Sequence, residues 1–217
     1  MASWVNRAPL PSPNFDLYLV TDRNQTGGRD LLWVLEQALD GGVEAVQLRE
    51  KDLGGRELFV LAEKAKRLCQ RYQASLFVND RVDVALGVDA DGVQLGSASM
   101  PVGVARELLG GKKLIGVSTH STKEAGEAEK EGADFILFGP VYFTPSKAAY
   151  GKPQGLGPLK EVVEKISLPV YAIGGVRVEN IIEVKATGIR GVALISAVLS
   201  AADPRRAAQE VLETLER

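Results

Sequence analysis

The stretch Val46-Gln47-Leu48-Arg49-Glu50-Lys51 has the pattern of a β-strand that ends in charged side chains. Successive side chains of a strand point to opposite faces, so Gln47, Arg49 and Lys51 share one face. Strands of a parallel sheet are usually buried on both faces, where two cations need anionic partners. The stretch therefore predicts a buried strand whose end contacts a phosphorylated ligand. A solvated turn at Lys51, with Arg49 paired to a local carboxylate, would explain the same residues.

The pattern of this stretch recurs along the chain, because short apolar runs alternate with segments of helical periodicity. Besides residues 45–50, the apolar runs lie at residues 17–22, 76–79, 92–95, 114–118, 135–138, 170–173 and 192–195. Eight strands that alternate with helices favour a parallel sheet closed into a barrel over an open doubly wound sheet. The expected fold class is therefore α/β, with residues 16–217 forming a single (βα)8 TIM barrel as the catalytic domain. Residues 1–15, with prolines at 9, 11 and 13, are expected to form a short, flexible N-terminal arm.

Capping residues mark the starts of several expected helices. Asp30 precedes a helical pattern, Ser121 with Glu124 makes a capping-box pattern, and Asp203-Pro204 supplies an N-cap and a first-turn proline. A long helix is expected over residues 56–72, and the helical pattern is weakest after the third strand.

Composition limits the partners that the chain can have. A formal net charge of −2 over 217 residues gives no general field for nucleic acid or an anionic membrane, so neither partner is expected. The expected partners are small phosphorylated substrates held by a local group of cations. Cys69 is the only cysteine, which excludes a disulfide within the chain and favours a buried, inert thiol. The chain shows neither the apolar core of a signal peptide nor a run of about 20 apolar residues, so a cytoplasmic protein is expected. A homo-oligomer is left open, because no face is conspicuously apolar.

Active sites of (βα)8 barrels lie at the C-terminal ends of the strands, and reactive residues collect there in this sequence. They are Gln47, Arg49 and Lys51 at the second strand, Asn79 and Asp80 at the third, Ser118 and His120 at the fifth, Gly174 and Gly175 after the seventh, and Ser196 at the eighth. A carboxylate facing a phosphate needs a cation between them, and Mg²⁺ binds one or two carboxylates together with phosphate oxygens. Asp80 therefore predicts a Mg²⁺ site. The plainer alternatives are that Asp80 caps the next turn or pairs with Arg81.

The connection from 139 to 157 is the longest non-helical segment expected. Thr144, Ser146 and Lys147 supply two hydroxyls and an amine that can cradle phosphate oxygens, in a functional lid or in a solvated surface loop. The paired glycines 174–175 fit a backbone phosphate site, although a tight turn would also explain them. His120, the only histidine, is either a hydrogen-bonded residue at the barrel rim or a catalytic base.

Six motifs, in order along the expected strand ends, resemble those of the thiamine-phosphate synthase family. They are Val-Gln-Leu-Arg-Glu-Lys at 46–51, Val-Asn-Asp-Arg at 78–81, Gly-Val-Ser-Thr-His at 116–120, Gly-Pro-Val-Tyr-Phe-Thr-Pro-Ser-Lys at 139–147, Ala-Ile-Gly-Gly at 172–175 and Ile-Ser-Ala at 195–197. The resemblance implies a (βα)8 enzyme that joins hydroxymethylpyrimidine diphosphate to a thiazole phosphate, giving thiamine phosphate and pyrophosphate. It also implies that pyrophosphate leaves first, and that the thiazole nitrogen traps the resulting pyrimidine-stabilised carbocation.

The resemblance assigns roles position by position. Residues that would contact the pyrimidine diphosphate are Gln47, Arg49, Lys51, Asn79, Ser118 and Lys147, of which Arg49, Lys51, Ser118 and Lys147 would act in catalysis. Residues that would hold the thiazole phosphate are Thr144, Ser146, Gly175, Ile195 and Ser196. Asp80 would ligate Mg²⁺.

Two positions depart from the family pattern. Ser99 stands where the family usually has a second metal-binding aspartate, which should weaken Mg²⁺ binding, and Gln94 replaces a usual histidine. The departures keep two alternatives open. One is a sister group of thiazole tautomerases, which use a histidine at the place of His120 and no metal. The other is a catalytically silent barrel that binds thiazole or thiamine phosphates as a regulator.

Overall fold

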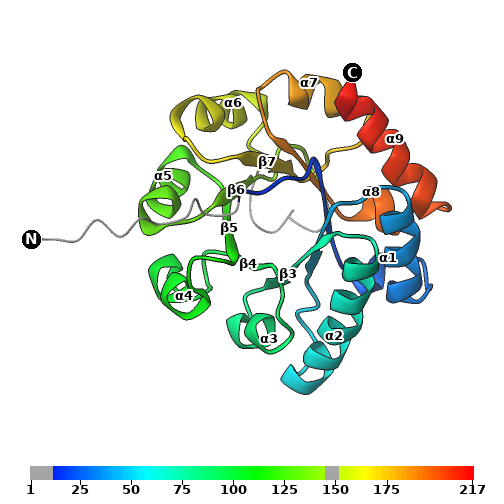
Figure 1. Ribbon diagram of the computed structural model, residues 1–217. Helices are drawn as coiled ribbons and strands as arrows, with labels where there is room; N and C mark the ends of the chain where they lie inside the picture. The colour runs from blue at the N-terminus through cyan, green and yellow to red at the C-terminus, as the bar shows by residue number, and fades with distance from the viewer. Residues whose placement is uncertain (1–11, 145–151) are drawn as a thin grey trace, which may run out of the picture.

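The computed structural model describes residues 12–144 and 152–217, and these residues form a closed parallel barrel inside a ring of helices (Figure 1). The strands are β1 (Leu17–Val20), β2 (Ala45–Leu48), β3 (Ser75–Asn79), β4 (Gly92–Leu95), β5 (Leu114–Thr119), β6 (Phe135–Phe138), β7 (Val170–Ile173) and β8 (Gly191–Leu194). Each strand pairs in parallel with the next, and β8 closes the barrel by pairing with β1. The predicted α/β class and (βα)8 barrel are confirmed.

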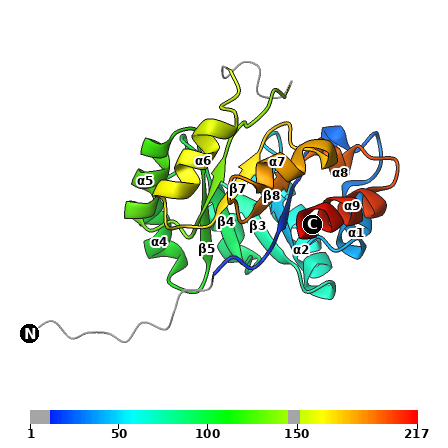
Figure 2. The ribbon, with the colours of Figure 1, turned by 90° about the horizontal axis from the view of Figure 1, so that it is seen from above.

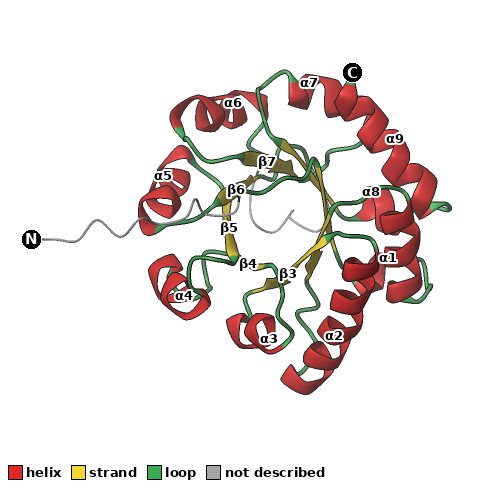
Figure 3. Ribbon diagram, viewed as in Figure 1, coloured by secondary structure: helices red, strands yellow, loops and turns green. Residues whose placement is uncertain are grey.

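The helices lie outside the strands (Figure 3). They are α1 (Leu31–Asp40), α2 (Gly55–Arg71), α3 (Val82–Gly87), α4 (Val102–Leu109), α5 (Thr122–Glu131), α6 (Leu156–Lys165), α7 (Ile181–Lys185), α8 (Ser196–Leu199) and α9 (Pro204–Glu216), with 3₁₀ turns at Arg23–Gln25 and Val178–Asn180. Seen from above, the strands run between α4, α5 and α6 on one side and α1, α2 and α9 on the other (Figure 2). None of the helices formed by residues 12–144 and 152–217 has the length and apolar character needed to cross a bilayer.

The helix starts follow the predicted caps, with one difference. Asp30 Oδ1 accepts the Trp33 N–H over 3.0 Å, and Asp203 Oδ1 accepts the Arg206 N–H over 3.0 Å. Ser121 Oγ accepts the Glu124 N–H, which is half of the predicted capping box. The Glu124 carboxylate instead accepts the N–H of His120 over 2.8 Å, one residue before the cap.

The second strand ends two residues before the predicted boundary at residue 50. The Arg49 N–H, which would continue the strand, donates to the Thr21 hydroxyl over 2.9 Å. A side chain from the end of β1 thus takes the place of the next backbone partner. Because this partner is distant in sequence, the apolar pattern alone could not show where β2 stops.

Aromatic rings fill the barrel interior toward the N-terminal ends of the strands. The rings of Phe15, Tyr18, Phe77, Phe135 and Tyr171 have centroids 4.8 to 6.5 Å apart, mostly edge to face. All five are buried, and burial raises the pKa of both tyrosines well above the usual range. Phe15 was assigned to the flexible arm, yet it lies in this core, which therefore begins before residue 16. Residues 1–11 of the predicted arm lie outside the described residues.

Above the aromatic rings the inner face becomes polar. Followed from strand to strand, the register returns to β1 displaced by eight residues, the shear of a (βα)8 barrel. In such a barrel, alternate strands contribute four side chains to each interior layer. One layer therefore contains Gln47, Gln94, Leu137 and Ala193, and the next contains Val20, Asn79, Ser118 and Ile173. The predicted polar residues thus share the barrel mouth at the C-terminal ends of the strands.

Candidate active site

Two glutamine side chains form the polar side of the first layer above the aromatic rings. Gln94 Nε2 donates to Ser118 Oγ over 3.1 Å, which joins this layer to the next. Gln47 and Gln94 are 2% and 1% exposed, yet within the described residues neither Gln47 Nε2 nor Gln94 Oε1 has a hydrogen-bond partner. The Gln47 amide also lies beside the Tyr18 hydroxyl, and this proximity partly offsets the rise that burial causes in the pKa of Tyr18. The Tyr18 hydroxyl and Gln47 Nε2 nevertheless do not form a hydrogen bond of normal geometry. Because buried polar atoms are nearly always paired, the Gln47 N–H donor and the Gln94 carbonyl oxygen are free to form hydrogen bonds with a ligand or water.

Arg49 and Lys51 follow β2 at the mouth. Arg49 is half-buried and Lys51 is exposed, and neither takes part in an ion pair found among residues 12–144 and 152–217. The alternative in which Arg49 pairs with a local carboxylate is therefore not what the described residues show. Lys51 does begin a turn, as the solvated alternative expected. The two cations at the end of β2 thus remain available to an anionic ligand.

Asp80 follows β3 in a left-handed backbone conformation, with φ of 61°. Its Oδ2 accepts a hydrogen bond from Asn79 Nδ2 over 2.7 Å, and its Oδ1 accepts one from Ser99 Oγ. The Ser99 hydroxyl in turn accepts the Gly96 N–H over 2.6 Å. Positions 80 and 99, predicted to share a metal, are therefore in direct contact.

The two plainer alternatives for Asp80 do not match its contacts. Arg81 pairs with Asp83 through two hydrogen bonds of 2.8 and 2.6 Å, and this pairing lowers the pKa of the Asp83 carboxyl. The N-cap of α3 is Arg81, which makes no side-chain capping bond. Asp80 is thus neither the partner of Arg81 nor a helix cap.

The donors at this position suit Mg²⁺, which prefers oxygen ligands and keeps several sites for water and phosphate. Asp80 offers a carboxylate and Ser99 a hydroxyl on the same side of the mouth. Within the described residues, no group of three or more histidine, cysteine, aspartate or glutamate side chains could hold a metal alone. A metal here would therefore depend on oxygens of a bound phosphate as well as on Asp80.

The glycines after β7 are required by close packing. Gly174 and Gly175 have φ of 96° and 67°, and a Cβ added to them would lie 2.5 Å from Pro140 Cβ and 2.7 Å from Tyr142 Cβ, respectively. The Val141 and Tyr142 N–H groups donate to the carbonyls of Ile173 and Gly174, both over 2.9 Å. The start of the connection after β6 thus lies against the start of the connection after β7.

The remaining predicted phosphate-binding residues divide into two groups. Ile195 is half-buried at the end of β8, and Ser196 is exposed at the first position of the short helix α8. Thr144 is half-buried in the connection after β6, whereas Ser146 and Lys147 lie outside the described residues. The Gln154 and Gly155 N–H groups donate to the carbonyls of Pro140 and Val141 over 2.8 and 2.9 Å, so the two ends of this connection are joined at the mouth.

Comparison with known proteins agrees with this arrangement. Residues 17–198 match the family model described as "Thiamine monophosphate synthase". The chain belongs to this family. A Geobacter sulfurreducens protein is 56% identical over 93% of this chain and 95% of its own length. The thiamine-phosphate synthase of Clostridium novyi is 46% identical over 86% of this chain and 91% of its own length.

The fold of the family is equally clear from solved structures. The thiamine phosphate pyrophosphorylase of Pyrococcus furiosus superposes with a TM-score of 0.85 at 42% identity, covering 93% of this chain and 96% of that one. A 3-hexulose-6-phosphate synthase superposes with a TM-score of 0.68 at 19% identity, which reflects the shared barrel alone. The predicted family and enzyme class, a transferase of thiamine biosynthesis, are confirmed.

His120 is placed at the rim of this family's barrel. Its Nδ1 lies 3.1 Å from Glu124 Oε2, the same oxygen that accepts its backbone N–H. Its side chain is 38% exposed. The structure thus shows a hydrogen-bonded rim residue, and a catalytic role for His120 stays a prediction.

Sequence reasoning missed several polar residues at the mouth of this thiamine-phosphate synthase family member. Thr21, Arg23 and Glu50 form a hydrogen-bonded group between the ends of β1 and β2. Glu50 carried a signal, because it is a carboxylate among apolar residues on one face of a buried strand. Gln94 was noted as a departure but was not included among the predicted site residues.

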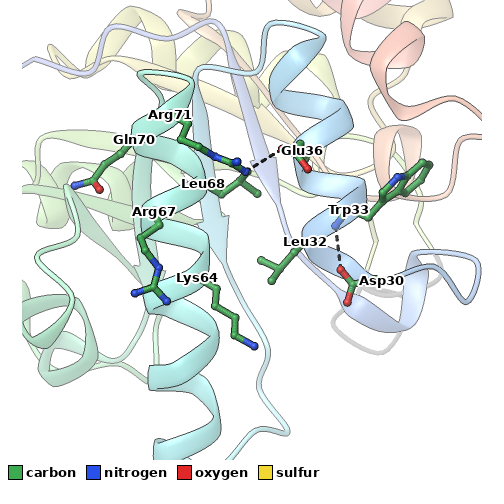
Figure 4. Close-up of a pocket in the computed structure, with 9 residues that line it drawn as sticks. All are labelled: Asp30, Leu32, Trp33, Glu36, Lys64, Arg67, Leu68, Gln70 and Arg71. Atoms are coloured by element: carbon green, nitrogen blue, oxygen red, sulfur yellow. Dashed lines mark hydrogen bonds and ion pairs between the residues drawn. The ribbon is translucent and has the colours of Figure 1, made fainter.

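Two hollows on the surface of the described residues lie away from the mouth. One of about 850 Å³ separates α1 from α2 outside the barrel, where Arg71 reaches across to Glu36 over 2.9 Å (Figure 4). Another of about 750 Å³ lies near Phe15, toward the N-terminal ends of the strands. Neither is lined by a predicted site residue, so the candidate active site rests on the residues that converge at the strand ends.

Proposed function

We propose that this chain joins hydroxymethylpyrimidine diphosphate to a thiazole phosphate at the mouth of the barrel, giving thiamine phosphate and pyrophosphate. The observation that carries the proposal is the convergence of polar side chains from β2, β3 and β5 above an aromatic core. The half-buried Arg49 and the exposed Lys51 lie beside these side chains without a protein anion among the described ion pairs.

The pyrimidine diphosphate would lie over the polar layers. Gln47, Asn79 and Ser118 offer amide and hydroxyl groups to the ring, and the unpaired Gln47 Nε2 is a donor of that kind. Arg49 and Lys51 would bind the diphosphate. Lys147, which lies outside the described residues, would add a third cation.

The thiazole phosphate would bind on the β7 and β8 side of the mouth. Gly175, Ile195 and Ser196 would offer backbone or hydroxyl groups there, and Thr144 would approach from the neighbouring connection. Ser146 is proposed for the same phosphate, although it too is outside the described residues. The two substrates would thus approach each other from different parts of the rim.

Asp80 would hold Mg²⁺, with Ser99 as a neutral neighbour. When bound, the metal supplies positive charge to the leaving diphosphate. Asp80 is suited to this role because Asn79 and Ser99 fix both of its carboxylate oxygens. Ser99 provides no second negative charge, so we expect weaker Mg²⁺ binding than an aspartate pair would give.

In this reaction the protein would neutralise the charge of the leaving group and position the two substrates. Negative charge grows on the departing pyrophosphate, and Arg49 and Lys51 would stabilise it in a site that is already arranged. No protein nucleophile is required, because the thiazole nitrogen forms the new bond. The polar layers would hold the two rings within reach of each other and keep water from the reacting carbon.

The test is formation of thiamine phosphate and pyrophosphate from the two purified substrates, with Mg²⁺ and with a chelator. We expect Mg²⁺-dependent product from the wild type and a large loss with Asp80→Asn. Asp83→Asn is the matched control, since it removes a nearby carboxylate whose ion-pair partner is Arg81, a residue with no proposed role in the site. Absence of product with both substrates and Mg²⁺ present would reject the proposal.

The same experiment separates the alternatives. Thiazole isomerisation without metal, lost in His120→Asn, would favour a tautomerase in which the His120–Glu124 pair acts as acid or base. Binding of thiamine phosphate without any turnover would favour a regulator.

A further inference from the structure

Glu50 is a buried carboxylate next to the proposed diphosphate site. Its side chain is 1% exposed, although it lies between two cations in sequence. Its Oε1 accepts the Thr21 hydroxyl over 2.6 Å, and its Oε2 accepts both the N–H and the guanidinium of Arg23, over 3.1 and 3.2 Å. A buried carboxylate with this many partners holds its own backbone in one place.

The Thr21 hydroxyl joins this carboxylate to the backbone of Arg49. Thr21 is 0% exposed, and its hydroxyl donates to Glu50 while accepting the Arg49 N–H over 2.9 Å. One buried hydroxyl therefore fixes two consecutive residues at the point where β2 ends.

The hydrogen bonds between the ends of β1 and β2 extend beyond Lys51. Arg23 makes two further hydrogen bonds to the Asp52 carboxylate, of 2.7 and 2.6 Å, and this guanidinium lowers the pKa of Asp52. Glu50 and Asp52, on either side of Lys51, are thus held by Arg23. Because side chains alternate at the end of β2, fixing Glu50 against β1 leaves Arg49 to point the other way, toward the mouth. Lys51, at the start of the turn, lies between the two held residues Glu50 and Asp52.

We infer that Thr21, Glu50 and Arg23 are positioning residues that aim Arg49 and Lys51 at the diphosphate. The inference rests on the proposed function, in which those two cations bind the leaving group. None of the three needs to touch the substrate. Their effect passes through the backbone of residues 49–51, so it should be specific to the diphosphate substrate.

The test compares Thr21→Val, which removes the hydroxyl at constant shape, with Thr21→Ser, which keeps it. Thr214→Val is the control, because Thr214 is also buried and its hydroxyl donates to the Glu210 carbonyl within the outer helix α9. Binding of inorganic pyrophosphate with Mg²⁺ is measured by calorimetry, together with the KM of each substrate and the melting temperature. A misplacement of about 1 Å can cost on the order of 10²-fold in rate.

For Thr21→Val we expect pyrophosphate binding weakened by about tenfold or more and a raised KM for the pyrimidine diphosphate, with the KM for the thiazole phosphate unchanged. Thr21→Ser should restore both values. Thr214→Val should change neither value. A purely structural role predicts instead that both substrates are affected equally.

Unchanged pyrophosphate affinity in a folded Thr21→Val, with an active wild type, overturns this inference and leaves the proposed function intact. A wild type that neither binds pyrophosphate nor turns over rejects both. If Thr21→Val does not fold, the exposed Asp52→Asn decides the question. Asparagine keeps the shape of the side chain but removes the negative charge that pairs with Arg23. Severalfold weaker pyrophosphate binding would support the inference, and unchanged binding would overturn it.

Discussion

Ser99→Asp would place a second carboxylate against Asp80, and its effect can be worked out from the contacts there. Two unit charges about 4 Å apart repel by about 4 kcal/mol at an effective dielectric constant of about 20. Both residues are half-exposed, so solvent and salt reduce this to about 1 kcal/mol. Loss of the bonds that the Ser99 hydroxyl makes with Asp80 and the Gly96 N–H adds about 1 kcal/mol. Without metal, the variant should therefore be less stable by about 2 kcal/mol, or about 4–8 °C in melting temperature for a chain of this size.

Magnesium should reverse the sign of this effect. The assay is thermal unfolding of both proteins in a chelator and across a Mg²⁺ titration, which reports metal binding without reference to activity. Ser99→Asp should gain stability with Mg²⁺ at concentrations at least about tenfold lower than the wild type requires. Ser97→Asp is the control, since it adds the same charge at an exposed position two residues earlier. If both variants melt alike with and without Mg²⁺, residue 99 is not beside a metal and the reasoning is wrong.

Three further predictions address the mouth, the thiol and the core. Arg49→Ala should lower kcat/KM by about 10²–10³. The control Arg190→Ala removes a cation that pairs with a carboxylate at the opposite end of the barrel, and it should change kcat/KM by less than about twofold. Equal kcat/KM values for Arg49→Ala and the wild type would exclude the assigned role. Burial raises the pKa of the Cys69 thiol to about 12, so at mildly alkaline pH the thiol stays protonated and an alkylating reagent should modify it only as the protein unfolds; rapid labelling of the native protein would contradict this. A Cβ at Gly116 would overlap the Phe135 ring and the Gln94 amide, so Gly116→Ala should lower the free energy of unfolding in urea by about 1–3 kcal/mol. Gly103→Ala has open space around it and should be neutral or slightly stabilising. Equal stability of the two variants would refute the packing at Gly116.

The barrel was predictable because its strands are short apolar runs at regular intervals, a signal that depends only on neighbours in sequence. The strands at 92–95, 135–138 and 170–173 have the predicted limits. The end of β2 differs because the Thr21 hydroxyl, 28 residues away, takes the Arg49 N–H. Phe15 was missed for a similar reason, since a single aromatic residue after three prolines has no periodicity to reveal that it enters the barrel.

The site was predictable as far as strand ends could be located. Face alternation predicted that Glu50 lies on the face opposite Arg49 and Lys51, but it could not show that Thr21 and Arg23 would surround the Glu50 carboxylate. Such contacts depend on the register between neighbouring strands, which the sequence of one strand does not specify.

In strand β3 and the residue after it, different residues pack the core and face the proposed active site. In β3 the Phe77 ring packs into the aromatic core, two residues before Asn79 and three before Asp80 at the mouth. Asp80 has a left-handed backbone, which costs most residues about 1 kcal/mol or more but is tolerated by aspartate, whose short side chain can bond locally. Its N–H donates to the Gln94 carbonyl over 3.0 Å, so the neighbouring strand β4 holds this conformation in place. Backbone geometry therefore restricts residue 80 to a few types, and among them only aspartate also brings the negative charge that the proposed metal site requires.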